Sequence, residues 1–221
     1  MQRVLDMLFS AIALLVLAPL LIPVVLILRF TGEGEVFFRQ DRVGEGGRTF
    51  RLLKFATMLK NSPNMGTGTV TVTDDPRVLP FGRFLRKTKL NELPQLLNIL
   101  TGDMSIIGPR PQTRRCFDAF PEEAQADIVK VRPGLSGIGS IVFRGEESLY
   151  AGVEDPDDLY DRLIMPYKGE LERWYVARRG PGLYFLLIGL TAWIVLFPGS
   201  RIVWRLFPGL PNPPNELADK L

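Results

Sequence analysis

The sequence of 221 residues contains no histidine and a single cysteine, Cys116. Without histidine there is no Ser-His-Asp triad, no Cys-His pair and no His-ligated zinc site. One cysteine also excludes an internal disulfide and a CxxC metal site, and it is compatible with a reducing compartment. Any catalysis must therefore use carboxylates, Lys, Arg, Tyr, backbone groups or a hard metal ion.

The chain also lacks a large net charge of either sign. Its 27 Lys and Arg residues nearly balance its 24 Asp and Glu residues, which gives a net charge of +3. The basic residues flank apolar segments and lie in loops, whereas a nucleic-acid binder would cluster them on a polar module. We therefore expect anionic lipid or phosphate ligands and no nucleic-acid partner. The length suggests one domain with appendages, or two small ones.

The longest apolar run, Val4–Leu28, contains one charge, Asp6. As a helix of about 37 Å it exceeds the roughly 30 Å hydrocarbon core of a bilayer. Pro19 and Pro23 interrupt it, and prolines this close predict a sharp bend in this part of the helix. Basic residues at both ends give no orientation bias. The residues alone leave two alternatives equal, namely a kinked spanning helix and a re-entrant hairpin with both ends in the cytoplasm.

The middle of the chain reads as mostly helical with a small sheet, so we expect an α/β fold. EVFF at 35–38 predicts a short strand, and TFRLLKF at 49–55 predicts a second strand or the start of a helix. Residues 61–77 are polar and rich in Gly, Thr and Asn, which predicts a loop. FGRFLRKTK at 81–89 predicts a basic amphipathic helix, either interfacial at an anionic membrane or ordinary with a solvated basic face.

A second apolar block, Leu183–Phe197, is too short to span a bilayer comfortably, at about 22 Å as a helix. Trp204 follows it between two arginines, and both residue types favour the lipid–water boundary. We expect an interfacial or shallowly dipping C-terminal helix, with a buried core helix as the alternative. The Pro-rich tail after it is expected to be irregular.

Three arginines are candidates for phosphate binding: Arg86, Arg110 and Arg144. Arg110 lies between Pro109 and Pro111, so a stiff backbone presents its guanidinium. Arginine is the preferred fork for phosphate oxygens, although an exposed ion pair is its commoner role.

The stretch LNELPQ predicts a helix start. Asn91 is a favoured N-cap, Glu92 suits the positive end of the helix dipole, and Pro94 is tolerated in a first turn. The same free N–H groups also suit a bound phosphate. A cap and an anion site are therefore compatible here.

Several long motifs occur in a specific order: QDRVGEGGRTFRLLKFATM, RKTKLNELPQLLNILTGDMSIIGPRP and VRPGLSG, after a Pro-broken apolar helix. In these motifs, roughly over residues 1–197, the sequence resembles the bacterial sugar transferases, which are small monotopic phosphoglycosyl transferases. The resemblance implies transfer of a phosphosugar from a UDP-sugar to a membrane polyprenyl phosphate, with release of UMP and a need for Mg²⁺. It places this reaction first among the membrane steps of polysaccharide or glycan biosynthesis.

The resemblance also implies roles for individual residues. Glu92 matches the Glu of a catalytic Asp-Glu dyad and is the expected metal ligand, and Asn91 stands at the position of the nucleophilic Asp. Arg86, Arg110 and Arg144 match arginines that face phosphates. Ala18–Pro19 matches the break of a re-entrant helix, which favours the hairpin over the span.

This sequence departs from the family pattern at Asn91, at Ala56, where a basic residue is usual, and around Arg144 in FRGEE. A carboxamide is a poor nucleophile and a weak Mg²⁺ ligand. Glu92 would then act as nucleophile or base, with Glu146 or Glu147 as an auxiliary carboxylate, or polyprenyl phosphate would attack directly. The alternatives are a catalytically silent member that binds nucleotide sugar or polyprenyl phosphate, an engineered Asp-to-Asn form, or a membrane-anchored scaffold.

The expected organisation has three parts: a re-entrant membrane helix at 1–30, a compact cytoplasmic catalytic core at 31–177, and an interfacial apolar helix with a Pro-rich tail at 178–221. The expected location is the bacterial inner membrane, with the core on the cytoplasmic face. A homo-oligomer remains one option for the assembly.

Overall fold

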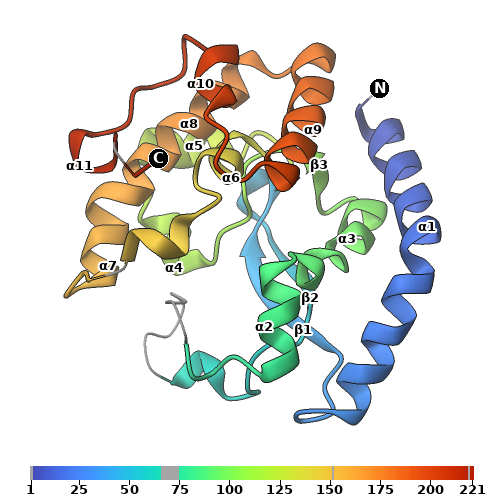
Figure 1. The fold of residues 1–221 in the computed structure, drawn as a ribbon. Coiled ribbons are helices and arrows are strands. Elements are labelled where there is room, and N and C mark those ends of the chain that lie inside the picture. Colours follow the sequence, from blue (N-terminus) through green and yellow to red (C-terminus); the bar gives the residue numbers. More distant parts are fainter. Residues whose placement is uncertain (1, 66–74, 151, 219) are drawn as a thin grey trace. The chain divides into compact units, whose positions relative to one another are not determined.

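The computed structural model describes residues 2–65, 75–150, 152–218 and 220–221. Contacts within the chain group into two units. Unit 1 comprises Met1–Asp41 and Arg51–Gly102, and unit 2 comprises Arg42–Phe50 and Asp103–Leu221. A hairpin contributes residues to both, since its strands β1 (Phe37–Val43) and β2 (Thr49–Phe55) pair with each other (Figure 1). The strand predicted at 49–55 is confirmed, whereas the one predicted at 35–38 overlaps β1 only at Phe37 and Phe38 and continues to Val43.

Unit 1 is otherwise helical. Its further elements are α1 (Gln2–Phe30), the 3₁₀ turns η2 (Ser62–Asn64) and η3 (Leu90–Glu92), and the helices α2 (Pro80–Lys87) and α3 (Gln95–Thr101). The predicted loop at 61–77 includes η2, and its residues 66–74 lie outside the described part of the chain.

Helix α1 runs without interruption through Pro19 and Pro23 (Figure 1). The predicted break at Ala18–Pro19 is therefore wrong for this structure. Each proline removes only one backbone N–H from the hydrogen-bond ladder, and a long helix on either side tolerates that loss. Of the described helices, α1 alone is long and apolar enough to cross a membrane by length and composition.

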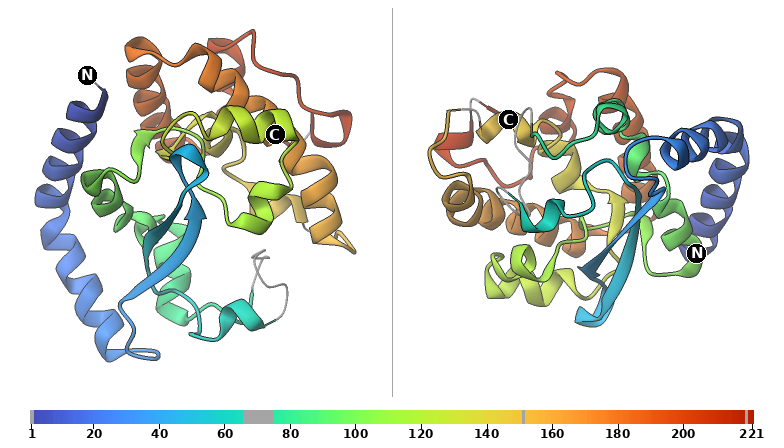
Figure 2. Two further views of the ribbon diagram at one scale, coloured as in Figure 1. Left: turned by 180° about the vertical axis from the view of Figure 1, so that it is seen from behind. Right: turned by 90° about the horizontal axis from the view of Figure 1, so that it is seen from below.

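Both ends of α1 are attached to unit 1. Near its start, the Arg3 guanidinium donates hydrogen bonds to the carbonyls of Ile99 and Leu100 at the end of α3, the second at 2.7 Å. Helix α3 lies alongside this part of α1 in the views of Figures 1 and 2. Near its end, Val24 and Leu28 are buried in a cluster with Phe55 of β2 and Leu85 of α2.

The middle of α1 is exposed and apolar. Leu15 is 77% exposed and Val16 69% exposed, and Ile12, Leu20 and Ile22 are also exposed. A continuous apolar surface of this kind is unusual on a soluble face and marks an interaction site. Asp6 is the one charged residue of the apolar run. It is only 1% exposed, so it does not place a charge on this apolar surface.

Helix α2 confirms the helix predicted at 81–89. Pro80 occupies the first turn, where its missing N–H costs nothing. Gly82 and Leu85 are buried, and a Cβ on Gly82 would lie 2.2 Å from the Thr57 carbonyl oxygen, so only glycine allows this approach. The opposite face carries Arg83 and an exposed Phe84. The helix is therefore basic and apolar on its outer side.

Unit 2 contains a second two-stranded sheet surrounded by short helices. Its elements are η1 (Glu45–Gly47), β3 (Ser105–Ile107), α4 (Arg114–Asp118), α5 (Glu122–Ile128), β4 (Gly134–Ser136), α6 (Ile138–Val142), η4 (Glu146–Tyr150), α7 (Pro156–Leu159), the π-helical turn η5 (Tyr160–Ile164), α8 (Met165–Arg178), α9 (Pro181–Leu196), α10 (Ile202–Leu206) and α11 (Asn215–Ala218). The expectation of a mostly helical α/β chain with small sheets is confirmed.

The two motifs SIIGPRP and VRPGLSG meet as the parallel strands β3 and β4, with Ser105 opposite Gly134 and Ile107 opposite Ser136. Their backbones come unusually close. A Cβ on Gly134 would lie 2.1 Å from the Gly108 nitrogen, so glycine is required there. This pairing fixes the start of the loop that carries Arg110.

Helix α9 packs one face on this sheet. Tyr184, Leu187, Leu190 and Ile194 recur at helical spacing and are buried, while Phe185, Trp193 and Leu196 on other faces are exposed. Helix α9 is therefore buried on one side, as the core-helix alternative expects, and its interfacial position stays a prediction.

The tail beyond α9 is better ordered than expected. It forms α10 and α11, and it buries Leu210 and Leu217. Tyr167 of α8 donates a hydrogen bond to the Pro211 carbonyl at 2.8 Å, and the rings of Trp174 and Phe207 meet edge to face at 5.2 Å. The tail is thus part of the packing of α8.

The predicted three-part organisation groups residues by their surroundings, whereas the two units group them by contacts. By contacts, α1 belongs with residues 51–102, and α9 and the tail belong with residues 103–177. The membrane, catalytic and C-terminal parts stay predictions.

Candidate active site

The turn η3 and helix α2 pack against each other in unit 1. Arg86 lies in the last turn of α2, and Asn91 and Glu92 lie in η3. Between them, Lys89 adopts a left-handed backbone with φ of 60°. That conformation is uncommon outside glycine, and such residues gather at functional sites. Unit 1 therefore brings three predicted site residues into one neighbourhood.

The prediction that Asn91 caps the following helix is wrong. Helix α3 begins at Gln95, with Pro94 before it, and its start has no side-chain cap. A capping side chain accepts from the N–H groups two or three residues onward. For Asn91 these would be Leu93, whose N–H already donates to the Leu90 carbonyl, and Pro94, which has none.

Asn91 is instead a buried residue with an unused acceptor. Asn91 is 7% exposed, and its Oδ1 has no hydrogen-bond partner among the described residues. A buried polar atom left unpaired costs on the order of 1–3 kcal/mol, and it is a feature that needs an explanation. A ligand that donates a hydrogen bond, or a cation, would satisfy it.

Glu92, the expected metal ligand, is partly buried beside Asn91. In the part of the chain that the structure describes, no three acidic or cysteine side chains gather closely enough to hold a metal by themselves. Mg²⁺ is commonly bound by one or two carboxylates together with substrate phosphates. A carboxylate and an amide oxygen without a partner, on consecutive residues of η3, are donors of the kind that such a site uses.

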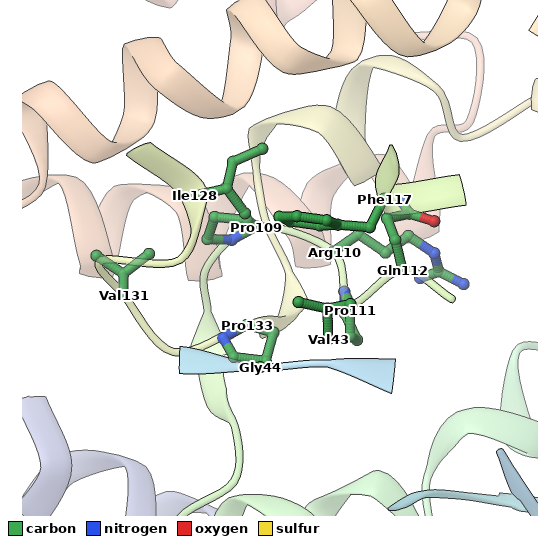
Figure 3. Close-up of a pocket in the computed structure, with 10 residues that line it drawn as sticks. All are labelled: Val43, Gly44, Pro109, Arg110, Pro111, Gln112, Phe117, Ile128, Val131 and Pro133. Atoms are coloured by element: carbon green, nitrogen blue, oxygen red, sulfur yellow. The ribbon is translucent and has the colours of Figure 1, made fainter. Parts of the chain in front are cut away.

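Arg110 lies in the loop after β3, in unit 2. The loop is held by a hydrogen bond from the Gly134 N–H to the Pro109 carbonyl, at 2.8 Å. Pro109, Arg110 and Pro111 line a small pocket, in which the Phe117 ring points toward Pro109 (Figure 3). The backbone around Arg110, predicted to be stiff, is thus also held by a hydrogen bond from the VRPGLSG motif.

Arg144 lies between α6 and η4, also in unit 2, and is partly buried. Glu146, a candidate auxiliary carboxylate, has both oxygens engaged: Oε1 accepts from the Tyr150 hydroxyl at 2.9 Å, and Oε2 lies 2.7 Å from the Lys168 ammonium. Burial acts to raise the pKa of Glu146, but the charge and hydrogen bond of Lys168 outweigh it and lower the pKa. The side chain of Glu147 lies outside the described part. The roles of both glutamates stay predictions.

Sequence reasoning missed the buried charges of α8. Lys168 is 5% exposed and Glu172 is 3% exposed, and burial raises the pKa of Glu172 to about 8, against the opposing effects of the Arg110 N–H and the Lys168 charge. In the sequence they belong to a run of mixed charges that reads as an ordinary solvated helix face. No feature of spacing distinguishes them from exposed neighbours such as Glu170.

A family model described as "Bacterial sugar transferase" matches residues 1–198. The match covers most of the chain, and the protein therefore belongs to the bacterial sugar transferase family. The resemblance stated from the motifs is confirmed. The residues from 199 onward lie outside the matched range.

Curated relatives specify the family further. The chain is 37% identical over 161 residues to the exopolysaccharide production protein ExoY of Sinorhizobium fredii, covering 66% of this chain and 71% of that protein. It is 39% identical over 143 residues to the UDP-N-acetylgalactosamine-undecaprenyl-phosphate N-acetylgalactosaminephosphotransferase of Aeromonas hydrophila, covering 64% and 34%. It is 37% identical over 149 residues to the UDP-glucose:undecaprenyl-phosphate glucose-1-phosphate transferase of Escherichia coli, covering 66% and 32%. The matched region is thus about a third of the length of the latter two.

Proposed function

We propose that this protein transfers a phosphosugar from a UDP-sugar to a polyprenyl phosphate such as undecaprenyl phosphate, and releases UMP. The observation that carries the proposal is the turn η3, in which Glu92 follows Asn91 in the chain, the buried Asn91 Oδ1 has no partner among the described residues, and the turn packs against the helix of Arg86. The names of the relatives support the same reaction. They do not favour a catalytically silent member or an engineered form.

The proposed roles follow from charge. Arg86 in unit 1 would bind phosphate oxygens, and Arg110 and Arg144 in unit 2 would do the same, because a guanidinium fork matches phosphate oxygens. Glu92 would hold Mg²⁺, which would neutralise charge on the diphosphate. The Asn91 amide oxygen accepts a hydrogen bond or serves as a neutral ligand, but it does not attack, since a carboxamide is a poor nucleophile.

The phosphosugar can be transferred by two routes. In direct transfer, an oxygen of polyprenyl phosphate attacks the phosphorus that bears the sugar, a new P–O bond forms, and the P–O bond to UMP breaks. In the covalent route, the Glu92 carboxylate makes that attack first, UMP leaves, and polyprenyl phosphate then displaces Glu92. Direct transfer predicts sequential initial-rate kinetics, and the covalent route predicts ping-pong kinetics.

We further propose that α1, as an unbroken helix, dips its apolar middle into one side of the membrane without crossing it, so that both of its ends stay on the same side. Both of its ends are bound by unit 1, through Arg3 and through Val24 and Leu28, while its middle is exposed and apolar. A helix that spanned the bilayer would carry its two ends to opposite faces. The outer faces of α2 and α9 would rest at the interface, with the protein on the cytoplasmic side of the inner membrane.

The reaction is tested by UMP release from a panel of UDP-sugars, with the purified protein in nanodiscs containing undecaprenyl phosphate and Mg²⁺. The wild type is expected to turn over at least one UDP-sugar, and Glu92→Gln is expected to abolish release. Asn212→Asp, an exposed position in the tail, is the matched control for Asn91→Asp. Turnover by Asn91→Asp alone would refute the proposal for this sequence.

The topology is tested separately by labelling single cysteines in a Cys116→Ser background. Gln2→Cys and Thr31→Cys mark the two ends of α1. Both are expected to react with an impermeant maleimide only after the cells are opened. Labelling of one end in intact spheroplasts would show a spanning helix instead.

A further inference from the structure

Two buried ionisable side chains of α8 lie one turn apart and contact the two arginine-bearing loops of unit 2. We name Lys168 and Glu172 the α8 pair. Their i and i+4 spacing places them on the same face of the helix. Neither belongs to the residues matched to phosphate binding, so their burial needs a separate reason.

Lys168 binds the segment of Arg144 on both sides. Its ammonium lies 2.7 Å from Glu146 Oε2 and 4.9 Å from the centre of the Phe143 ring. Arg144 stands between Phe143 and Glu146 in the chain. A single charged group therefore fixes the residues that flank this arginine, by an ion pair and by a cation–π contact.

Glu172 binds the loop of Arg110. Its Oε1 accepts from the Arg110 backbone N–H at 3.4 Å. Because Pro109 and Pro111 have no N–H, this is the one backbone donor of the Pro-Arg-Pro unit. A Cβ on Gly139 would lie 2.4 Å from the same carboxylate oxygen, so glycine in α6 leaves the space that Glu172 uses.

Stability alone gives a poor reason for this arrangement. Within the described residues, Glu172 Oε2 has no hydrogen-bond partner. Replacing buried ionic groups by apolar side chains of similar volume is often neutral or stabilising. A buried carboxylate that remains incompletely paired is better explained by the one bond it makes, which is to Arg110.

We propose that Lys168 and Glu172 are positioning residues, which hold the backbones of Arg144 and Arg110 at a fixed spacing from a single helix face so that both guanidinium groups engage the phosphates of the nucleotide sugar. The inference rests on the proposed function for its consequence, and on the contacts of α8 for its geometry. The pair acts through the arginines and need not touch substrate.

The test uses the full chain in nanodiscs and compares Glu172→Leu, Glu172→Gln and Lys168→Met with Glu170→Leu, an exposed position on the same helix. Glu172→Leu and Lys168→Met are expected to raise KM for the UDP-sugar about tenfold, equal to about 1.4 kcal/mol of lost binding. Glu172→Gln keeps an acceptor for the Arg110 N–H and is expected to restore KM to near the wild-type value. A merely structural role would not separate Gln from Leu in this way.

Hydrogen exchange tests the geometry independently of turnover. Glu172→Leu is expected to speed amide exchange in the peptide covering 108–112, and Lys168→Met in the peptide covering 143–148. Should Glu172→Leu fail to fold, Gly139→Ala displaces the same carboxylate and is expected to speed exchange at 108–112. Glu170→Leu should change neither peptide.

The outcomes separate the two proposals. If the wild type releases no UMP from any UDP-sugar, the proposed function fails, and faster exchange in these peptides still supports the geometric part. If the wild type turns over but the α8 variants leave both KM and exchange unchanged, the positioning inference is overturned and the function stands. Equal KM values for Glu172→Leu and Glu172→Gln would likewise overturn it.

Discussion

Asp75 of unit 1 and Glu172 of unit 2 are both buried carboxylates, but their surroundings act on them in opposite ways. In unit 1, Asp75 and Arg77 are both buried and fully paired: Arg77 Nη2 lies 2.5 Å from Asp75 Oδ2, and Nη1 donates to the carbonyls of Ser62 and Met65. The hydrogen bond from Arg77 holds the pKa of Asp75 below its usual value. In unit 2, burial raises the pKa of Glu172 to about 8.

The direction of the pKa shift therefore separates two kinds of buried carboxylate. Asp75 is favoured as an anion and closes a structural pair. Glu172 is disfavoured as an anion, and one of its oxygens has no partner among the described residues. The first arrangement contributes to stability, and the second costs stability, which fits a role in the site.

The largest expected effect on stability comes from removing the charge of Asp75, which is paired with Arg77. Asp75→Asn leaves the Arg77 guanidinium buried without its counter-charge and is expected to lower the free energy of unfolding by about 3–5 kcal/mol. Because the folded pKa of Asp75 is lowered, its contribution is present above the unfolded pKa and is lost as pH falls through the folded pKa. Chemical denaturation at pH 7 and pH 3 measures both. A loss under about 1 kcal/mol at pH 7 would contradict the assignment.

The contribution of Glu172 to stability should depend on pH in the opposite direction. The folded pKa of Glu172 is raised above the ordinary 4.5, so the folded protein retains a proton that the unfolded chain releases. Stability from this group is full below about pH 4.5 and is lost as pH rises through about 8. Between pH 5 and pH 8 the loss is on the order of 3–4 kcal/mol, since each pKa unit corresponds to about 1.4 kcal/mol. Glu172→Gln removes this loss. The difference in unfolding free energy between Glu172→Gln and wild type should grow from pH 5 to pH 8, and a constant difference would rule the shift out.

A smaller effect is expected at the edge of the same cluster. Tyr150→Phe removes the hydroxyl that donates to Glu146, while Lys168 still pairs with the carboxylate. A single hydrogen bond to a charged group that keeps its ion pair contributes about 1–2 kcal/mol. Thermal unfolding should show this loss. A much larger one would mean that Tyr150 holds the ion pair together.

The same contrast explains what the sequence reveals. The strand at 49–55, the helix at 80–87 and the start of the strand at 37–43 follow from local pattern. The sequence does not predict that SIIGPRP and VRPGLSG pair as the strands β3 and β4, because that pairing joins distant segments. The sequence itself indicates that Asn91 is a poor N-cap, because Pro94 lacks one of the two N–H groups that a capping side chain would bind. That signal is present in the sequence itself.

Other features could not be predicted because they depend on contacts between distant segments. Glu172 and Arg110 are 62 residues apart, and nothing local to GELER shows that its first and second charges differ in burial. The course of α1 is a second example, because proline content predicts a break, whereas the helix continues through both prolines and contacts α3, β2 and α2. Burial of a charge is a property of the tertiary structure, which a single sequence conceals.

The smallest expected effect comes from an exposed ion pair and gives the baseline for the comparison. Arg114 and Asp118 lie four residues apart on α4, 3.4 Å between Nη1 and Oδ1, with side chains 59% and 55% exposed. Solvent screens such a pair, and the usual contribution is about 0.3–0.5 kcal/mol. Asp118→Asn should therefore change the unfolding free energy by less than about 0.5 kcal/mol, and by less still at 1 M salt. If Asp118→Asn destabilised the protein as much as Asp75→Asn, burial would not be what distinguishes the carboxylates of this chain, and the contrast between the two units would lose its basis.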